Sequence, residues 1–336
     1  MALYFPRRIR GRRSRTQRRI YIISGLLIIA VVFAFIYGLS SSGEDEGETV
    51  QPLIESEAKD EIPPPAPEPV LLEVAPEPTS EPNSQVAKLV AEAVELVDAK
   101  PPKIIEARDR LNEVLPMPMS GRQQAVVKRQ LSELADKWLF SRVVFPQDRL
   151  CGTYEVERGD QLRTVGRRFK VPYEMLMQIN KIARPEALQA GETIKVINGP
   201  FHVRVYRSTF TMDLYLQNTF VRSFPVGLGQ PGMETPTGLW AVKSDGKLIS
   251  PTWTDPMSGK TYEPQDADYP LGSRWIGLEG LKGEALGRTG FAIHGTRNPE
   301  EIGTAGSQGC IRLLNGDAIL VYNLLVPEYS RVEVVE

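Results

Sequence analysis

Cysteine and histidine are scarce in this chain of 336 residues, which contains two of each. Two cysteines, Cys151 and Cys310, are too few for a disulfide-stapled scaffold, and no Cys-x-x-Cys spacing indicates a metal site. Net charge is also small, because 40 basic and 42 acidic residues leave -2. The overall charge therefore says little about partners.

The first part of the chain distributes its charge very unevenly. Residues 1–19 contain eight arginines and no acid, and residues 20–39 contain no charged residue. About 20 residues at about 1.5 Å rise span the roughly 30 Å of a bilayer's hydrocarbon core, which predicts one transmembrane helix over 20–39. Arginines before such a helix stay in the cytoplasm, so we expect the rest of the chain on the extracytoplasmic side, at the periplasm or cell wall.

Two other interpretations of this start remain open. One is a cleaved signal peptide, which the long apolar run and the lack of an Ala-x-Ala site disfavour. The other is a nucleic-acid-binding arm joined to a buried helix. Because the arginines are explained as a topology signal, we expect a membrane anchor and no nucleic-acid partner.

Two segments separate this anchor from the rest. Residues 40–83 combine nine prolines with a large excess of acids, which predicts a disordered, self-repelling linker. Residues 84–141 show apolar positions at helical spacing, with Ser84 as a plausible N-cap, and predict a module of three amphipathic helices. This module is interpreted as a spacer or a partner-binding unit, with plain structural packing as the alternative.

Residues 153–197 follow a strand–helix–helix–strand pattern. Its landmarks are Tyr154-x-Val156-x-x-Gly159-Asp160-x-Leu162, Asn180, and Leu188-x-x-Gly191-x-x-Ile194-x-Val196. This spacing resembles the LysM module. The resemblance implies a small βααβ fold that binds N-acetylglucosamine-containing glycans and tethers the chain to the wall, and a LysM-like packing spacer is the alternative.

Residues 201–336 alternate apolar and polar side chains as β-strands do, with helical spacing from Asp317 to Leu325. Within this mainly β domain His294 precedes Cys310 by sixteen residues. A nucleophilic cysteine acts as a thiolate, and a neighbouring histidine lowers its pKa and returns a proton to the leaving amine. Glycines at 306 and 309 allow tight turns whose N–H groups face an oxyanion. A disulfide between the two cysteines is the alternative, and it would remove the nucleophile.

The same domain carries a set of motifs in a fixed order. They are Val226-Gly227-Leu228-Gly229, Thr235-Pro236-Thr237-Gly238, Pro251-Thr252-Trp253, Pro270-Leu271-Gly272, Arg274-Trp275-Ile276, His294-Gly295-Thr296 and Ser307-x-Gly309-Cys310-Ile311-Arg312-Leu313. This order is similar to that of the YkuD family of L,D-transpeptidases. Gln308 stands where a frequent family member has histidine, which puts substrate contacts in doubt more than catalysis.

The family resemblance implies a β-sandwich-like catalytic fold that needs no cofactor. Cys310 would attack a peptidoglycan tetrapeptide stem at its third residue, with His294 as base and the Gly295 carbonyl orienting the imidazole. The N–H groups near Gly309 and Cys310 would hold the oxyanion. Ser307 and Arg312 would shape the site, and pairing of Arg312 with a carboxylate is an equal alternative.

The implied partners are peptidoglycan stem peptides and glycan strands. The acyl-enzyme would pass to an amine, making a 3-3 crosslink or exchanging the terminal D-residue, and the sequence does not identify this acceptor. Two rival functions remain. One is a non-catalytic wall-binding tether, and the other is a wall peptidase or amidase, in which the cysteine usually precedes the histidine.

Overall fold

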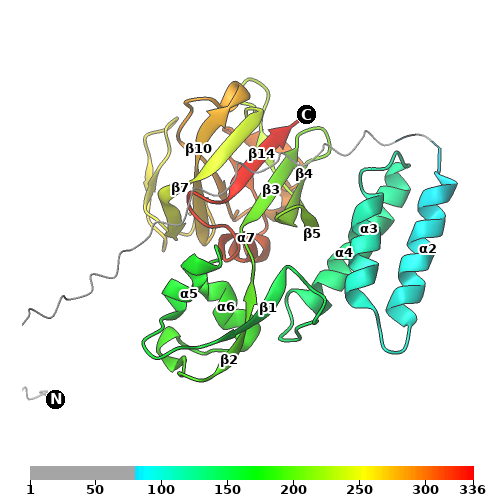
Figure 1. The fold of residues 1–336 in the computed structure, drawn as a ribbon. Coiled ribbons are helices and arrows are strands. Elements are labelled where there is room, and N and C mark those ends of the chain that lie inside the picture. Colours follow the sequence, from blue (N-terminus) through cyan, green and yellow to red (C-terminus); the bar gives the residue numbers. More distant parts are fainter. Residues whose placement is uncertain (1–78, 80) are drawn as a thin grey trace, which may run out of the picture. The chain divides into compact units, whose positions relative to one another are not determined.

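The computed structural model describes residues 79 and 81–336 (Figure 1). The basic segment 1–19, the predicted transmembrane helix 20–39 and most of the linker lie outside the described residues. Within the described part, none of the helices combines the length and apolar character needed to span a bilayer.

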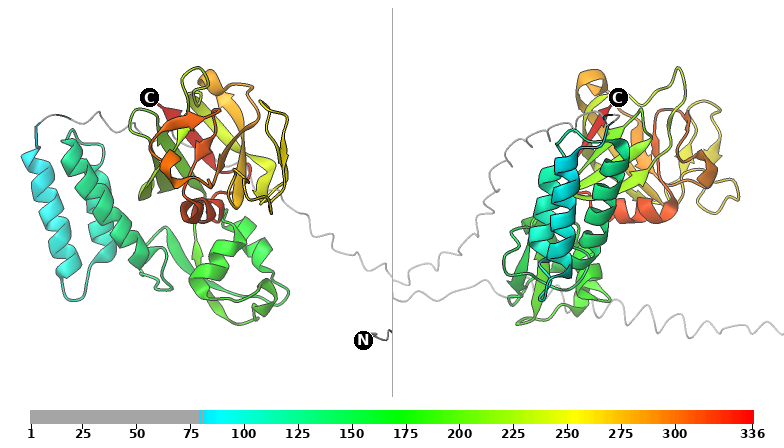
Figure 2. Two further views of the ribbon diagram at one scale, coloured as in Figure 1. Left: turned by 180° about the vertical axis from the view of Figure 1, so that it is seen from behind. Right: turned by 90° about the vertical axis from the view of Figure 1, so that its right-hand side faces the viewer.

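Three helices open the described chain and lie side by side (Figures 1 and 2). They are α2 (Ser84–Asp98), α3 (Ile104–Val114) and α4 (Gly121–Trp138). The N-cap of α2 is Asn83, whose side chain accepts two backbone N–H bonds from the first turn, so the prediction of Ser84 as the cap was wrong by one residue. Residues at helical spacing form the core of the module: Val86, Ala93, Ala107, Leu111, Val127, Leu131, Leu134 and Trp138.

The next segment is a two-stranded sheet with two helices. It consists of β1 (Cys151–Glu155), α5 (Leu162–Arg168), α6 (Tyr173–Asn180), the 3-10 helix η1 (Pro185–Ala187) and β2 (Thr193–Ile197), with β1 and β2 antiparallel. Asn180 joins α6 to β2. Its side chain donates to the Leu176 and Lys195 carbonyls and accepts the Lys195 N–H at 2.7 Å. This buried amide explains why an asparagine ends the second helix.

The remaining chain is mainly β-structure. Its strands are β3 (Phe201–Tyr206), β4 (Thr211–Leu216), β5 (Thr219–Pro225), β6 (Leu228–Gly229), β7 (Gly238–Ile249), β8 (Trp253–Thr254), β9 (Thr261–Tyr262), β10 (Arg274–Lys282), β11 (Phe291–His294), β12 (Ala305–Ser307), β13 (Ile311–Arg312) and β14 (Arg331–Val335). Eight of them form one sheet in the order β13-β11-β10-β7-β14-β3-β4-β5, and β6–β12 and β8–β9 form two small ribbons. The sequence analysis expected a β-sandwich-like fold. The structure has one large mixed sheet with two small ribbons.

A single α-helix of this region, α7 (Asn315–Tyr322), packs against β10 and β11. It begins two residues before the predicted helix and ends earlier than Leu325. Two short 3-10 helices, η2 (Gly283–Ala285) and η3 (Pro299–Glu301), lie in the connections. His202, on β3, accepts the Arg331 N–H at 3.1 Å and so joins the starts of β3 and β14.

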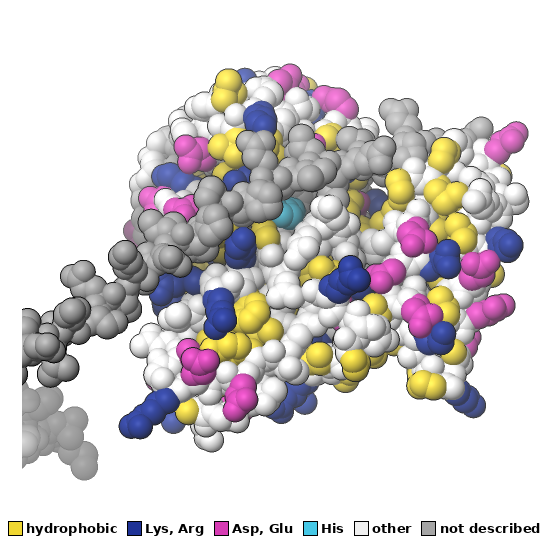
Figure 3. All heavy atoms as spheres, viewed as in Figure 1, with side chains coloured by type: hydrophobic (Ala, Val, Ile, Leu, Met, Phe, Trp, Pro, Cys, Tyr) yellow, Lys and Arg dark blue, Asp and Glu magenta, His cyan; other side chains and the backbone are white. Residues whose placement is uncertain are grey.

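The surface of the described residues mixes the two signs of charge. Figure 3 shows Lys and Arg side chains interspersed with Asp and Glu over the face in view. The face in view carries no broad patch of one sign.

Candidate active site

His294 is the last residue of β11, a short strand between β10 and β13. The register pairs it with Trp275 on one side and with Arg312 on the other. Its ring stacks on the Trp275 indole with centroids 5.6 Å apart and an interplanar angle of 16°. The sheet and the indole therefore fix both the position and the plane of the imidazole.

One hydrogen bond sets the orientation of this imidazole. His294 Nδ1 lies 2.6 Å from the Gly295 carbonyl oxygen, and because a carbonyl only accepts, Nδ1 carries the proton of the neutral ring. The other nitrogen, Nε2, is then the basic one. The side chain is only 4 % exposed, and this burial lowers the pKa of His294 to about 4.

Cys310 directly precedes the strand that pairs with β11. The parallel pairs Ile293–Ile311 and His294–Arg312 set β13 beside the end of β11, and Cys310 is the residue before β13. The cysteine and the histidine therefore belong to adjoining strand segments of one sheet. The thiol is half-buried, with its sulfur 4.0 Å from the Gly290 carbonyl oxygen.

The pKa of the thiol departs from the ordinary value of a cysteine. Burial raises the pKa of Cys310 to about 11, although a backbone hydrogen bond from Ala292 and the positive charge of Arg312 act in the opposite direction. His294 is not among the groups that shift this pKa, and burial lowers the pKa of the imidazole itself. Activation of the thiol by His294 stays a prediction.

Ser307 organises the turn that presents the cysteine. Its hydroxyl donates to the Cys310 carbonyl at 2.6 Å and accepts the Gly309 N–H at 3.1 Å. Gly309 has a φ of +106°, and a Cβ there would lie 2.6 Å from the Phe291 ring, so only glycine fits. Because the Gly309 N–H is already bonded to Ser307, it is not the open oxyanion donor that the sequence suggested, and the Cys310 N–H is left as the candidate.

A short ribbon holds the segment before this turn. β12 runs parallel to β6, and the backbone continues the pairing with hydrogen bonds from the Gln230 N–H to the Ser307 carbonyl and from the Leu228 N–H to the Thr304 carbonyl. Gly229 must be glycine because a Cβ would lie 2.1 Å from the Met233 carbonyl oxygen. The glycines after β5 thus let two chain segments approach closely behind the cysteine.

Arg312 pairs with a carboxylate. Its guanidinium lies 2.9 Å from Glu301 Oε2 and also donates to the Gly306 carbonyl. The same carboxylate accepts the Thr296 hydroxyl at 3.0 Å. Arg312 therefore ties the loop after His294 to the loop before Cys310.

Comparisons with known proteins identify the family of the chain. Residues 200–334 match the model of the YkuD family, described as the L,D-transpeptidase catalytic domain. YqjB of Bacillus subtilis, named as an L,D-transpeptidase, is 31% identical over 40% of this chain and 70% of its own length. The chain belongs to the YkuD family of L,D-transpeptidases. It is an enzyme of the acyltransferase class.

Other matches concern the LysM segment and further relatives of this L,D-transpeptidase. Residues 154–196 match the model of the LysM domain. YkuD of Bacillus subtilis, also named as an L,D-transpeptidase, is 29% identical over 54% of this chain and 98% of its own length. An L,D-transpeptidase structure from Mycobacterium tuberculosis has 20% identity and a TM-score of 0.33, covering 44% of this chain and 64% of that one.

Two residues that support the loop after His294 were not singled out from the sequence. They are Glu301 and Asn315, and Asn315 donates to the Thr296 carbonyl at 2.9 Å. Trp275, which stacks on His294, belongs to a motif that the sequence analysis quoted. A Cβ at Gly295 would lie 2.1 Å from the Asn315 side-chain oxygen, which explains the glycine after the histidine. Nothing in the sequence indicated these supporting contacts except that the residues lie near the quoted motifs, because the groups they contact are distant in sequence.

Gln308 lies two residues before Cys310 and lines a cavity that neither Cys310 nor His294 lines. Gln308 reaches the β8–β9 ribbon, where its amide donates to Asp255 at 3.3 Å. A cavity of about 670 Å³ adjoins the cysteine turn and is lined by residues that include Met233, Phe291 and Gln308. Among residues 79 and 81–336, no three His, Cys, Asp or Glu side chains gather as metal ligands would.

Proposed function

We propose that this protein is a peptidoglycan L,D-transpeptidase in which Cys310 is the nucleophile and His294 the general base. The observation that supports the proposal is the β11–β13 pairing, in which the strand that begins directly after Cys310 lies against the strand that ends at His294, whose basic nitrogen is defined by the bond of Nδ1 to Gly295. A nucleophile beside an oriented base is the arrangement that covalent acyl transfer requires.

The first half-reaction forms an acyl-enzyme. Cys310 Sγ attacks the carbonyl carbon at the L-centre of the third stem residue, and its proton passes to His294 Nε2. The tetrahedral intermediate collapses as the C–N bond to the terminal D-alanine breaks, and His294 returns the proton to the leaving amine. Because both groups start neutral, proton transfer accompanies the attack, and no preformed thiolate is needed.

The second half-reaction reverses these roles. An amine of another stem, or of a free D-amino acid, attacks the thioester carbonyl while His294 accepts its proton. The C–S bond breaks, and the proton returns to the Cys310 sulfur. The products are a new amide and the starting enzyme, so one proton is carried in each direction and no cofactor takes part.

Negative charge develops on the carbonyl oxygen in both steps. The Cys310 N–H is the donor that supports it, because the neighbouring Gly309 N–H is occupied by Ser307. Removal of one donor of this kind typically slows acyl transfer by about a hundredfold or more.

The test is exchange of the terminal residue. The full-length chain is incubated with a disaccharide tetrapeptide and an isotopically labelled D-amino acid, and mass spectrometry follows the label. We expect exchange with the unaltered chain and with Cys151→Ala, and at least about a thousandfold loss with Cys310→Ala. Shortened stems without label would indicate a peptidase, and wall binding without any change of the stem would indicate a tether.

The parts outside the catalytic domain fit the same substrate. The LysM match supports binding to glycan strands, and the apolar segment 20–39 supports an N-terminal membrane anchor with the catalytic domain outside the cytoplasm. Alkaline phosphatase, which is active only after export, would report the location when fused to the C-terminus. A green fluorescent protein fused at the same point would serve as the opposite reporter, because it fluoresces in the cytoplasm. An inactive phosphatase fusion together with a fluorescent one would contradict this topology.

A further inference from the structure

Thr235 is a buried polar residue that the reaction scheme has not used. It lies between β6 and β7, far from Cys310 in sequence, and is 4 % exposed. Its hydroxyl donates to the Gly309 carbonyl at 2.9 Å and accepts the Gly229 N–H at 3.1 Å. The carbonyl only accepts and the N–H only donates, so the direction of both bonds is fixed.

The carbonyl that Thr235 holds belongs to the peptide unit of the proposed oxyanion donor. Gly309 C=O and Cys310 N–H lie in one plane and point in opposite directions, because the peptide bond is planar and trans. Because the Thr235 hydroxyl holds the Gly309 carbonyl oxygen toward the β6–β7 segment, the Cys310 N–H of the same peptide unit points away from that segment.

This peptide unit needs an external anchor. Glycine occupies positive and negative φ with similar ease, so Gly309 by itself does little to prevent the peptide from turning over. The Ser307 hydroxyl accepts the Gly309 N–H and donates to the Cys310 carbonyl, but neither bond acts on the Gly309 carbonyl. The Thr235 side chain supplies the hydrogen bond to that carbonyl.

We infer that Thr235 is a positioning residue of this enzyme, which orients the Cys310 N–H toward the oxyanion through the Gly309 carbonyl. The inference rests on the proposed function, since it assigns a role within that acyl transfer. An oxyanion donor acts on the transition state more than on the bound substrate, so loss of the Thr235 hydroxyl lowers kcat and leaves KM nearly unchanged.

The experiment compares Thr235→Val, which keeps the shape and removes the hydroxyl, with Thr235→Ser, which keeps the hydroxyl. Thr237→Val is the matched control, because Thr237 is half-buried two residues along the chain and its hydroxyl contacts Glu284 instead of the cysteine turn. In the full-length chain we expect kcat for exchange to fall about thirtyfold in Thr235→Val, with KM within about twofold. Thr235→Ser and Thr237→Val should stay within about threefold of the unaltered chain.

A second readout separates positioning from a general loss of structure. Alkylation of Cys310 by iodoacetamide passes through no oxyanion, so its rate should be unchanged in Thr235→Val. If Thr235→Val does not fold, as judged by thermal unfolding, Thr235→Ala takes its place against Thr235→Ser.

Three results would overturn the inference. They are an unchanged kcat in Thr235→Val, an equal fall in exchange and alkylation, and a failure of Thr235→Ser to restore kcat. The proposed function would survive all three. Absence of exchange by the unaltered chain would instead refute the proposed function and the inference with it.

Discussion

The two cysteines lie in regions that are held together by different means. Around Cys310 the backbone is tied by neutral hydroxyls, those of Ser307 and Thr235. Around Cys151 it is tied by buried charges. Lys195 is 2 % exposed, and its ammonium donates to the carbonyls of three residues at the end of α4, Trp138, Ser141 and Val143.

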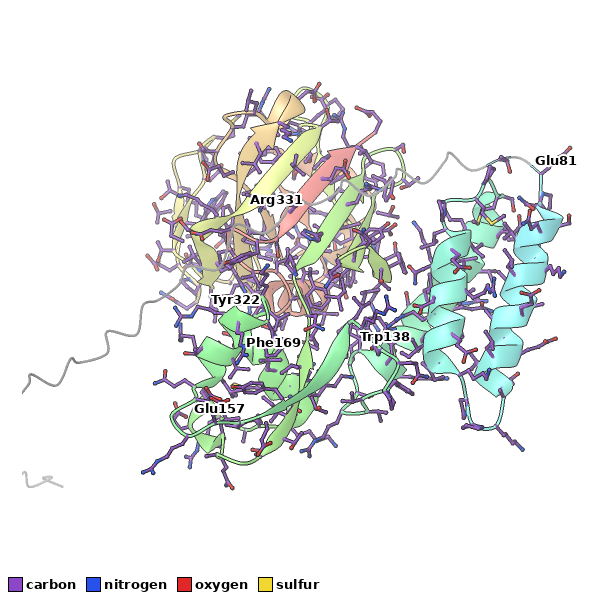
Figure 4. All side chains as sticks on the ribbon, viewed as in Figure 1. Glu81, Trp138, Glu157, Phe169, Tyr322 and Arg331 are labelled. Carbon is purple, nitrogen blue, oxygen red and sulfur yellow. The ribbon has the colours of Figure 1, made fainter. Side chains whose placement is uncertain are left out.

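A second buried charge supports the Cys151 region. Arg108, on α3, pairs with the fully buried Asp148 at 2.8 Å and lies over the Trp138 ring. Figure 4 labels Trp138 at the end of α4, beside the start of the LysM segment. Charges at this junction bind the helical module to the LysM segment.

The difference reflects what each region must do. A buried ammonium satisfies several carbonyls strongly, which suits a permanent junction. Near the nucleophile the same ammonium would stabilise a thiolate and alter its reactivity. Hydroxyls hold the peptide units next to Cys310, and the charge of Arg312 nearby is paired with Glu301.

The largest expected contrast is in alkylation. Cys151 is 2 % exposed and burial raises its pKa to about 12, so it should react only after the surrounding structure opens. We expect iodoacetamide to modify Cys310 at least about a thousandfold faster in the folded protein. Peptide mapping after a timed pulse measures both rates, and urea should abolish the contrast.

The pH dependence of this alkylation sharpens the description of the site. Because burial raises the Cys310 pKa to about 11, its rate should still be rising above pH 9. A plateau near neutral pH would instead reveal a thiolate–imidazolium pair. Cys151→Ser supplies the control, since it should leave this profile unaltered.

A smaller effect is expected at the charged junction. Lys195→Met keeps the length of the side chain but leaves three carbonyls without their donor, so unfolding free energy should fall by about 3 kcal/mol. Urea denaturation followed by tryptophan fluorescence measures the change. Lys88→Met, on an exposed face of α2, is the control with little expected effect.

The comparison also predicts a difference in function between the two regions. Lys195→Met should leave the rate of exchange on a soluble stem within about twofold, because the ammonium contacts α4 and its following loop and not the β11–β13 corner. A large loss of exchange in a variant that remains folded would show that the two regions are coupled.

Acid should destabilise the fold through its two histidines. His294 has a folded pKa of about 4, below its ordinary 6.5, so the unfolded chain binds the proton more readily. The stability this contributes is complete above about pH 6.5 and is lost as pH falls toward about 4, amounting to about 3 kcal/mol at most. Burial lowers the pKa of His202 to about 4 as well, so His202 adds a second contribution to the pH dependence of the unfolding free energy.

Denaturation between about pH 6.5 and 5 tests this prediction, because carboxylates contribute least there. His294→Gln should remove about half of the slope of unfolding free energy against pH, and His202→Gln the other half. An unchanged slope in both variants would mean that neither imidazole is held neutral by the fold.

Much of the fold was predictable from the sequence. The three helices after residue 83 and the LysM pattern follow from apolar spacing and local turn signals, which act within a few residues. Strands β3, β4 and β5 alternate visibly for the same reason. The strands β7, β10 and β11 were not predicted, because their positions depend on partners distant in sequence.

For the site, the sequence by itself determined the residue types and their order, namely His294 before Cys310 with glycines between them, because these are requirements of the chemistry. Only the tertiary structure decided that Thr235 anchors the cysteine turn and Glu301 pairs with Arg312, since such contacts exist only once distant strands are in register. The tertiary structure also decided the burial of the pair. Burial, which no sequence pattern measures, raises the pKa of the Cys310 thiol and lowers that of the His294 imidazole.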